Sequence, residues 1–164
     1  MSDQKTIAVF GLGSMGYGMA ASCLRAGHSV YGVDIAEEPM ARFRADGGQP
    51  GSVHSNADAL DAVVVVVLNA AQTQAVLFGE DGIAPKLRAG AVVLACATVP
   101  PAFAREMERR CGELGVYYLD APISGGSLKA ANGKLSIMAS GASEAFMAAA
   151  PVLNATAEKV FELG

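Results

Sequence analysis

Residues 6–20 read Thr6-Ile7-Ala8-Val9-Phe10-Gly11-Leu12-Gly13-Ser14-Met15-Gly16-Tyr17-Gly18-Met19-Ala20, and this stretch decides the fold. Its first apolar run, residues 7–10, predicts a buried parallel strand. Gly11, Gly13 and Gly16 follow in the spacing G-x-G-x-x-G, and small and apolar residues then predict a helix as far as Ala26. A strand, a glycine turn and a helix in this order are typical of a dinucleotide-binding site.

Each of the three glycines has a separate physical role in such a turn. Gly11 lets the chain leave the strand sharply, Gly13 lets a pyrophosphate approach the backbone, and Gly16 lets the helix pack against the strand. The start of the helix offers free N–H groups and the positive end of its dipole to the anion.

An acidic residue at the end of the next predicted strand, residues 29–33, strengthens this interpretation. Asp34 follows Gly16 by 18 residues and is placed to accept hydrogen bonds from the ribose hydroxyls of an adenosine. Its charge would repel a 2′-phosphate, and no Arg or Lys follows before Arg42, so NAD is favoured over NADP. The alternative for Asp34 is an ordinary turn residue or helix N-cap.

Length and composition limit the possible classes of protein. The chain has 164 residues, enough for one domain, with 52% hydrophobic residues and a net charge of −4. We therefore expect no nucleic-acid partner, and the apolar runs are too short to cross a membrane. Three scattered cysteines and an N-terminus without an apolar signal segment predict buried free thiols in the cytoplasm.

Strands and helices alternate along the rest of the chain. The expected strands are 49–53, 62–68, 91–95, 116–119, 134–140 and 159–163, and the expected helices are 37–45, a brief one begun by a cap at 55–58, 71–78, a short piece within 79–88, 101–114, and 143–149 with Ser143 as N-cap. This alternation predicts an α/β fold of Rossmann type: a doubly wound, mainly parallel sheet with helices on both faces. Strands after residue 119 need not be parallel.

Polar residues follow several of these strands, at the edge where open α/β sheets bind ligands. Asn69 is either a ligand contact or part of a plain strand-to-helix connection, and Thr98 either touches a cofactor or caps the next helix. The loop Ser124-Gly125-Gly126 presents a hydroxyl and successive N–H groups that suit a carboxylate, although a flexible connection is the alternative.

Two motifs together resemble the β-hydroxyacid dehydrogenase family, which includes 3-hydroxyisobutyrate, tartronate-semialdehyde and L-threonate dehydrogenases. The first is Gly11-Leu12-Gly13-Ser14-Met15-Gly16; the second is Asp120-Ala121-Pro122-Ile123-Ser124-Gly125-Gly126, followed by Gly133-Lys134-Leu135-Ser136-Ile137-Met138. The stretches at 69–73 and 141–146 look most like the L-threonate dehydrogenase branch.

The resemblance implies a role for each matching residue. Gly11, Leu12, Gly13, Ser14, Met15 and Gly16 would hold the NAD pyrophosphate, Asp34 and Ile35 the adenosine, and Leu68, Asn69 and Thr98 would line the cofactor. Ser124, Gly125 and Gly126 would bind the carboxylate of a small hydroxyacid. The family often has Met-Leu-Pro where this chain has Val66-Val67-Leu68, and this departure bears on the adenosine contacts that the resemblance implies there.

The resemblance also implies parts that these residues lack. In the family, a helical second domain follows, and a lysine in a G-x-x-x-K-x-x-N-type helix is the general acid/base. We therefore expect residues 1–164 to be the NAD-binding domain of a dehydrogenase, and we expect this domain to be inactive on its own. The full-length dehydrogenase could form a homo-oligomer. Lys129 and Lys134 lie near the substrate loop, but surface roles are expected for both.

Other classes of protein have weaker support. A non-catalytic dinucleotide-binding module remains an alternative, although it would not need the loop at Ser124. A methyltransferase also uses a glycine turn and an acid, but it does not account for the second motif. His28 and His54 are isolated from further ligands, so no metal site is predicted. The chain contains no G-x-S-x-G elbow and no G-x-x-x-x-G-K loop.

Overall fold

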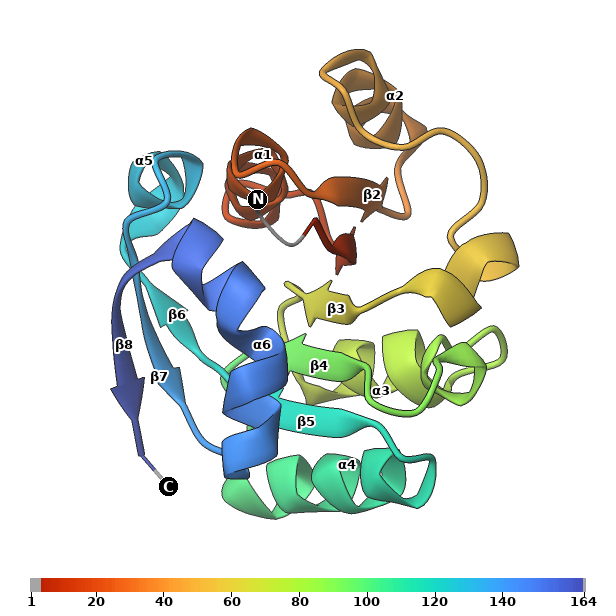
Figure 1. The fold of residues 1–164 in the computed structure, drawn as a ribbon, viewed down its shortest axis with the longest axis vertical. Coiled ribbons are helices and arrows are strands. Elements are labelled where there is room, and N and C mark those ends of the chain that lie inside the picture. The colour runs from red at the N-terminus through yellow and green to blue at the C-terminus, as the bar shows by residue number, and fades with distance from the viewer. Residues whose placement is uncertain (1–3, 164) are drawn as a thin grey trace.

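A computed structural model describes residues 4–163 and shows a parallel sheet covered by helices (Figure 1). Its five strands run in the order β2-β1-β3-β4-β5, with all four pairings parallel. Their bounds are β1 Thr6–Phe10, β2 Ser29–Val33, β3 Ala62–Val65, β4 Val92–Ala95 and β5 Tyr117–Asp120. The predicted domain also includes residues 1–3 and 164, and these lie outside the described residues.

Burial on both faces explains why the central strands are almost entirely aliphatic. Every residue of β3 and of β4 is buried. The apolar run that predicts strand 62–68 leaves the sheet after Val65, although Val66 N still donates to Phe10 O at 2.8 Å. Leu68 is then exposed, so the last part of the predicted strand forms a loop at the carboxyl edge of the sheet.

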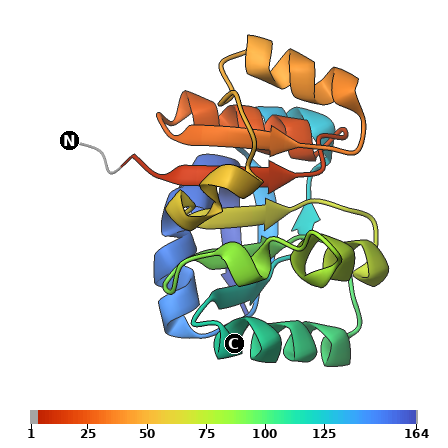
Figure 2. The ribbon, with the colours of Figure 1, turned by 90° about the vertical axis from the view of Figure 1, so that its right-hand side faces the viewer.

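Helices cover both faces of the sheet, as the sequence predicts. Their bounds are α1 Gly16–Arg25, α2 Glu37–Ala45, α3 Ala70–Phe78, α4 Pro101–Glu113, α5 Gly126–Ala131 and α6 Ser143–Thr156, with short 3₁₀ helices at His54–Ala59 and Ala84–Lys86. α1 and α6 pack on one face with Val9, Val64 and Leu94, whereas α3 and α4 pack on the other. Figure 2 shows α3 in front of the sheet and α6 behind it.

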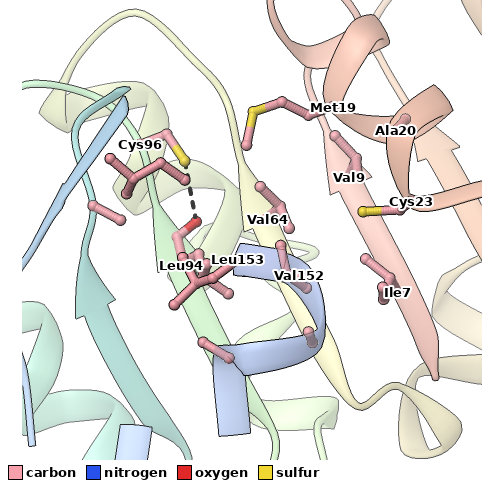
Figure 3. Close-up of a cluster of buried hydrophobic side chains, with 14 of the residues drawn as sticks. Ile7, Val9, Met19, Ala20, Cys23, Val64, Leu94, Cys96, Val152 and Leu153 are labelled. Atoms are coloured by element: carbon pink, nitrogen blue, oxygen red, sulfur yellow. Dashed lines mark hydrogen bonds between the residues drawn. The ribbon is translucent and has the colours of Figure 1, made fainter. Parts of the chain in front are cut away.

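Side chains from two helices and the sheet form the core on the first face (Figure 3). Met19 and Cys23 come from α1, Val152 and Leu153 from α6, and Leu94 from the sheet. The three cysteines are unpaired and buried, as predicted. Burial raises the pKa of each of these thiols to about 12.

A second, smaller sheet was not expected from the sequence. It contains β6 (Ile123–Ser124), β7 (Leu135–Ala139) and β8 (Ala157–Glu162), and α6 lies between it and the main sheet (Figure 1). β7 pairs antiparallel with β6 and parallel with β8. The main-chain groups of Asp120 and Ser140 bond to each other at 3.0 and 2.9 Å, so β5 is joined directly to the second sheet.

Some predicted elements are wrong. Residues 49–53 form no strand, because Pro50 has no N–H to donate and Gly51 has φ +91°. Ser143 is the first residue of α6 rather than its N-cap, and that cap position, Ala142, makes no side-chain bond. α6 continues past Ala149, with Pro151 inside it.

The 3₁₀ helix near residue 55 also differs from the prediction, since its cap position is Val53 and makes no side-chain bond. Among residues 4–163, no helix is long and apolar enough to span a bilayer.

Candidate functional site

The glycine turn lies between the ends of β1 and β3, where the strand order changes direction. Open α/β sheets bind ligands at such a switch point. Gly11 has φ +101° and donates from its N–H to Val33 O at 2.7 Å. A Cβ at Gly11 would lie 2.0 Å from Val66 O, and one at Gly16 would lie 1.7 Å from Gly11 O. Both positions therefore require glycine in this backbone arrangement.

The middle of the turn is open to solvent. Gly13 and Ser14 are exposed, and a Cβ at Gly13 would have no neighbour within 4 Å. Within residues 4–163, no acceptor bonds to the N–H groups of Gly13, Ser14 or Met15. Because α1 begins at Gly16, these free donors lie at the positive end of a helix dipole and suit an anion.

Asp34 lies directly against this turn. Its Oδ2 accepts from Leu12 N at 2.7 Å, and its Oδ1 accepts from Ala36 N at 3.0 Å. The bond between Ala36 N and Asp34 is a local turn, one of the alternatives that the sequence leaves open for Asp34. Asp34 is not a helix N-cap, because the N-cap of α2 is Ala36. An ionised carboxylate has about four lone-pair positions. Asp34 is partly exposed, so it keeps acceptor capacity for ligand hydroxyls.

Two apolar side chains project into solvent at the same edge. Ile35, immediately after Asp34, is fully exposed, and Leu68, after β3, is 84% exposed. Leu68 N donates to Gln72 Oε1 at 2.8 Å, which fixes the loop at the start of α3. Exposed aliphatic side chains of this kind suit the faces of a flat, apolar ring.

Asn69 caps a helix in the structure, whereas Thr98 does not. Asn69 is the N-cap of α3, where its Oδ1 accepts from Gln72 N at 2.9 Å, so its side chain stabilises the helix. Thr98 is exposed after β4. It does not cap α4, because that cap is Pro100, without a side-chain bond.

The substrate loop predicted from the sequence follows β5. Ser124 lies in β6 opposite Ser136, and Gly125 and Gly126 have φ +138° and +82°. All three loop residues, Ser124, Gly125 and Gly126, are exposed. A Cβ at Gly125 would lie 3.2 Å from Lys129 Cβ, so α5 packs directly against the loop.

Burial determines the electrostatics near the ends of β4 and β5. Asp120 Oδ1 and the Tyr118 hydroxyl are buried and without a partner among residues 4–163. Burial raises the pKa of Asp120 and that of Tyr118. The pKa of the Cys96 thiol is about 12, because of its burial and then the nearby Asp120. Cys96 is thus an inert thiol and no nucleophile.

No group of three or more potential metal ligands occurs among the side chains of residues 4–163. Lys129 and Lys134, the two lysines near the predicted substrate loop, are both exposed.

The sequence did not predict one contact of α1, its close packing against α5. A Cβ at Gly18 would lie 2.6 Å from Ala131 N, so α1 and α5 approach as only glycine allows. The density of small residues in α1 was the available signal, but it did not indicate which element packs there.

The fold and the edge of the sheet together define a dinucleotide-binding domain of Rossmann type. The family model for the NAD-binding domain of 6-phosphogluconate dehydrogenase matches residues 6–164, and the chain belongs to this family. NAD is therefore its cofactor, as predicted.

The curated relatives that match this chain include several dehydrogenases. L-threonate dehydrogenase of Haemophilus influenzae is 46% identical over 161 residues, which is 97% of this chain and 54% of that protein. NAD-dependent L-serine dehydrogenase of Pseudomonas aeruginosa is 34% identical, over 98% of this chain and 54% of that protein. The chain thus spans about half the length of the curated relatives it matches.

A solved structure confirms the fold. The crystal structure of 3-hydroxyisobutyrate dehydrogenase from Salmonella typhimurium superposes with a TM-score of 0.93 at 41% identity, covering 98% of this chain and 56% of that one. The predicted resemblance to β-hydroxyacid dehydrogenases is confirmed by these matches.

Proposed function

We propose that residues 1–164 are the cofactor-binding half of an NAD-dependent dehydrogenase that oxidises a small hydroxyacid, with L-threonate as the best candidate. One observation carries the proposal: the glycine turn after β1 and the loop after β5 both follow carboxyl ends of one parallel sheet. A ligand spanning that edge can therefore contact both. The 46% identity to L-threonate dehydrogenase supports the choice of substrate.

The proposed cofactor contacts follow from the geometry of the edge. The free N–H groups of Gly13, Ser14 and Met15 bind the pyrophosphate, and Leu12 links this turn to Asp34. Asp34 accepts from the adenosine ribose and disfavours the 2′-phosphate of NADP.

Further along the same edge, Ile35 and Leu68 contact the adenine. The backbone at Asn69 lines the cofactor, and Thr98 contacts the nicotinamide half of the cofactor. These four side chains are exposed at that edge. The Asn69 side chain also caps α3 through its bond to Gln72 N.

The proposed substrate site is the loop after β5. Ser124 donates its hydroxyl to the substrate carboxylate, and the backbone N–H groups of Gly125 and Gly126 add further donors. NAD bound at this edge would supply the hydride acceptor for oxidation of the carbinol carbon. The hydroxyl proton must pass to a general base at the same time.

We assign that base to a part of the full-length protein outside residues 1–164. Lys129 and Lys134 are exposed and the family resemblance gives them no such role. The relatives are nearly twice as long as this chain, which leaves room for a second domain that supplies the base. Assembly into a homo-oligomer and a cytoplasmic location are also proposed, the latter from the unpaired, buried thiols.

The test is NADH formation by the full-length protein with L-threonate, 3-hydroxyisobutyrate and L-serine. Ser124→Ala should raise KM for the hydroxyacid and leave the Kd for NAD unchanged, whereas Ser127→Ala, an exposed serine three residues away, should change neither. Binding of NAD without turnover of any of these acids would favour a non-catalytic module. Residues 1–164 alone should bind NAD with little turnover, and strong turnover would contradict the assignment of the base.

A further inference from the structure

α1 contacts a second part of the molecule beyond the glycine turn. Ser22, which is only 2% exposed, donates from its Oγ to Ala130 O at 2.9 Å. Arg25 donates from Nη2 to Ala131 O at 3.0 Å and to Ser22 Oγ at 3.1 Å. Ala130 and Ala131 are the last two residues of α5, so α1 supplies donors to the end of a different helix.

Ala130 O also accepts from Gly133 N at 3.3 Å, whereas the bonds to Ala131 O that the described residues show come from Arg25 and Ser22. The last carbonyls of a helix have no partner within it, and one buried without a partner is costly. α5 has six residues, far fewer than a helix needs to persist alone in water. Its stability therefore depends on what it packs against, and Gly18 lets α1 approach it closely.

The position of α5 in turn fixes the loop that precedes it. Gly125 is the residue before α5 and packs against the Lys129 side chain. Ser124, at the start of the loop, is held by its pairing with Ser136, whereas Gly125 and Gly126 have backbone conformations that only glycine adopts readily and lie at the start of α5. A shift of α5 along α1 would move the N–H group of Gly126, the first residue of α5, and with it the adjoining Gly125.

We propose that Ser22 and Arg25 are positioning residues for hydroxyacid binding, because they hold α5 and thereby the loop Ser124–Gly126. This inference rests on the proposed function, since it takes that loop as the substrate site. The contact spans 108 positions of sequence and joins the helix that starts at the cofactor turn to the substrate loop. Neither residue belongs to the glycine turn or to the loop Ser124–Gly126.

The experiment uses the full-length protein with NAD and L-threonate. Ser22→Ala and Arg25→Ala should each raise KM for L-threonate about 5-fold, the effect of losing one hydrogen bond of ordinary strength. Both should leave the Kd for NAD within about 2-fold. Arg25→Lys should recover part of the loss, because one ammonium reaches one carbonyl. Hydrogen exchange should accelerate in residues 126–134 and not in residues 7–15.

Thr156→Val is the matched control. Thr156 is fully buried and donates to Val152 O at 2.8 Å, so the variant also loses a buried hydroxyl-to-carbonyl bond, but one within α6 that does not involve α5. Thr156→Val should lower thermal stability without changing the KM for L-threonate or the Kd for NAD. If Ser22→Ala and Arg25→Ala behave as Thr156→Val does, the positioning role is overturned. If Ser124→Ala also leaves KM unchanged, the proposed substrate site fails as well; if Ser124→Ala raises KM, only the present inference fails.

Discussion

Gly13 and Gly16, two glycines of the turn after β1, should respond to a single added methyl group in different ways. At Gly16, the new Cβ would lie 1.7 Å from Gly11 O and 3.3 Å from Val66 Cβ. The nearest atoms belong to the backbone and to a packed side chain, so something must shift. Overpacking of this kind costs about 3 kcal/mol of unfolding free energy, and NAD binding should be lost together with the fold of the turn.

At Gly13, the same methyl group would meet no protein atom within 4 Å. Gly13→Ala should therefore fold normally and be stabilised by about 0.4–1 kcal/mol, because alanine restricts the unfolded chain. Its methyl group would, however, occupy the space where the pyrophosphate approaches the backbone. A clash worth about 1–3 kcal/mol corresponds to a Kd for NAD that is about 5- to 150-fold higher.

Gly112→Ala is the control, since that glycine lies within α4 and its Cβ would also be free of neighbours. It should gain about 1 kcal/mol from helix propensity and bind NAD as the wild type does. Chemical unfolding and calorimetric titration with NAD on the three variants separate stability from binding. Wild-type NAD affinity in Gly13→Ala would refute the assignment of the turn to the pyrophosphate.

Three further predictions concern single features of the structure. Asp34→Asn should weaken NADH binding about 10- to 150-fold, because charged hydrogen bonds of this kind are worth about 1.5–3 kcal/mol, while NADPH binding should weaken less. An unchanged NADH to NADPH affinity ratio would contradict the role of Asp34. Asn69→Ala should lower the free energy of unfolding by about 1 kcal/mol through loss of the cap on Gln72 N, as seen in urea melts, and full stability would show that the cap contributes nothing. Burial raises the pKa of the three thiols to about 12, whereas thiols of the unfolded chain ionise at about pH 9. Between these two pH values the unfolded state binds fewer protons than the folded state, so the free energy of unfolding should fall as pH rises. A pH-independent stability in that window would argue against the burial of the thiols.

The glycine turn could be predicted from sequence because its cause is local. Gly11 and Gly16 are required by atoms of the same strand–turn–helix unit and of Val66. The buried strands were predicted for a similar reason, since runs of valine suit a sheet that is covered on both faces. Residues 49–53 contain no such run, and the strand predicted there is wrong because Pro50 has no N–H to donate and Gly51 has φ +91°.

The role of Asn69 could not be decided from sequence, since a cap and a ligand contact use the same amide. The structure shows its bond to Gln72 N. The contact of Ser22 and Arg25 with α5 could not be predicted at all. It joins residues more than 100 positions apart, and it depends on how two helices pack. The second sheet was missed for the same reason, because β6 has only two residues and pairs through tertiary structure.

A crystal structure of the protein with NAD tests the central claim most directly. The diphosphate should lie against the N–H groups of Gly13, Ser14 and Met15, with the adenosine ribose within hydrogen-bond distance of Asp34. A dinucleotide bound elsewhere, or an Asp34 that bonds only to Leu12 and Ala36 while the ribose lies out of reach, would contradict this account.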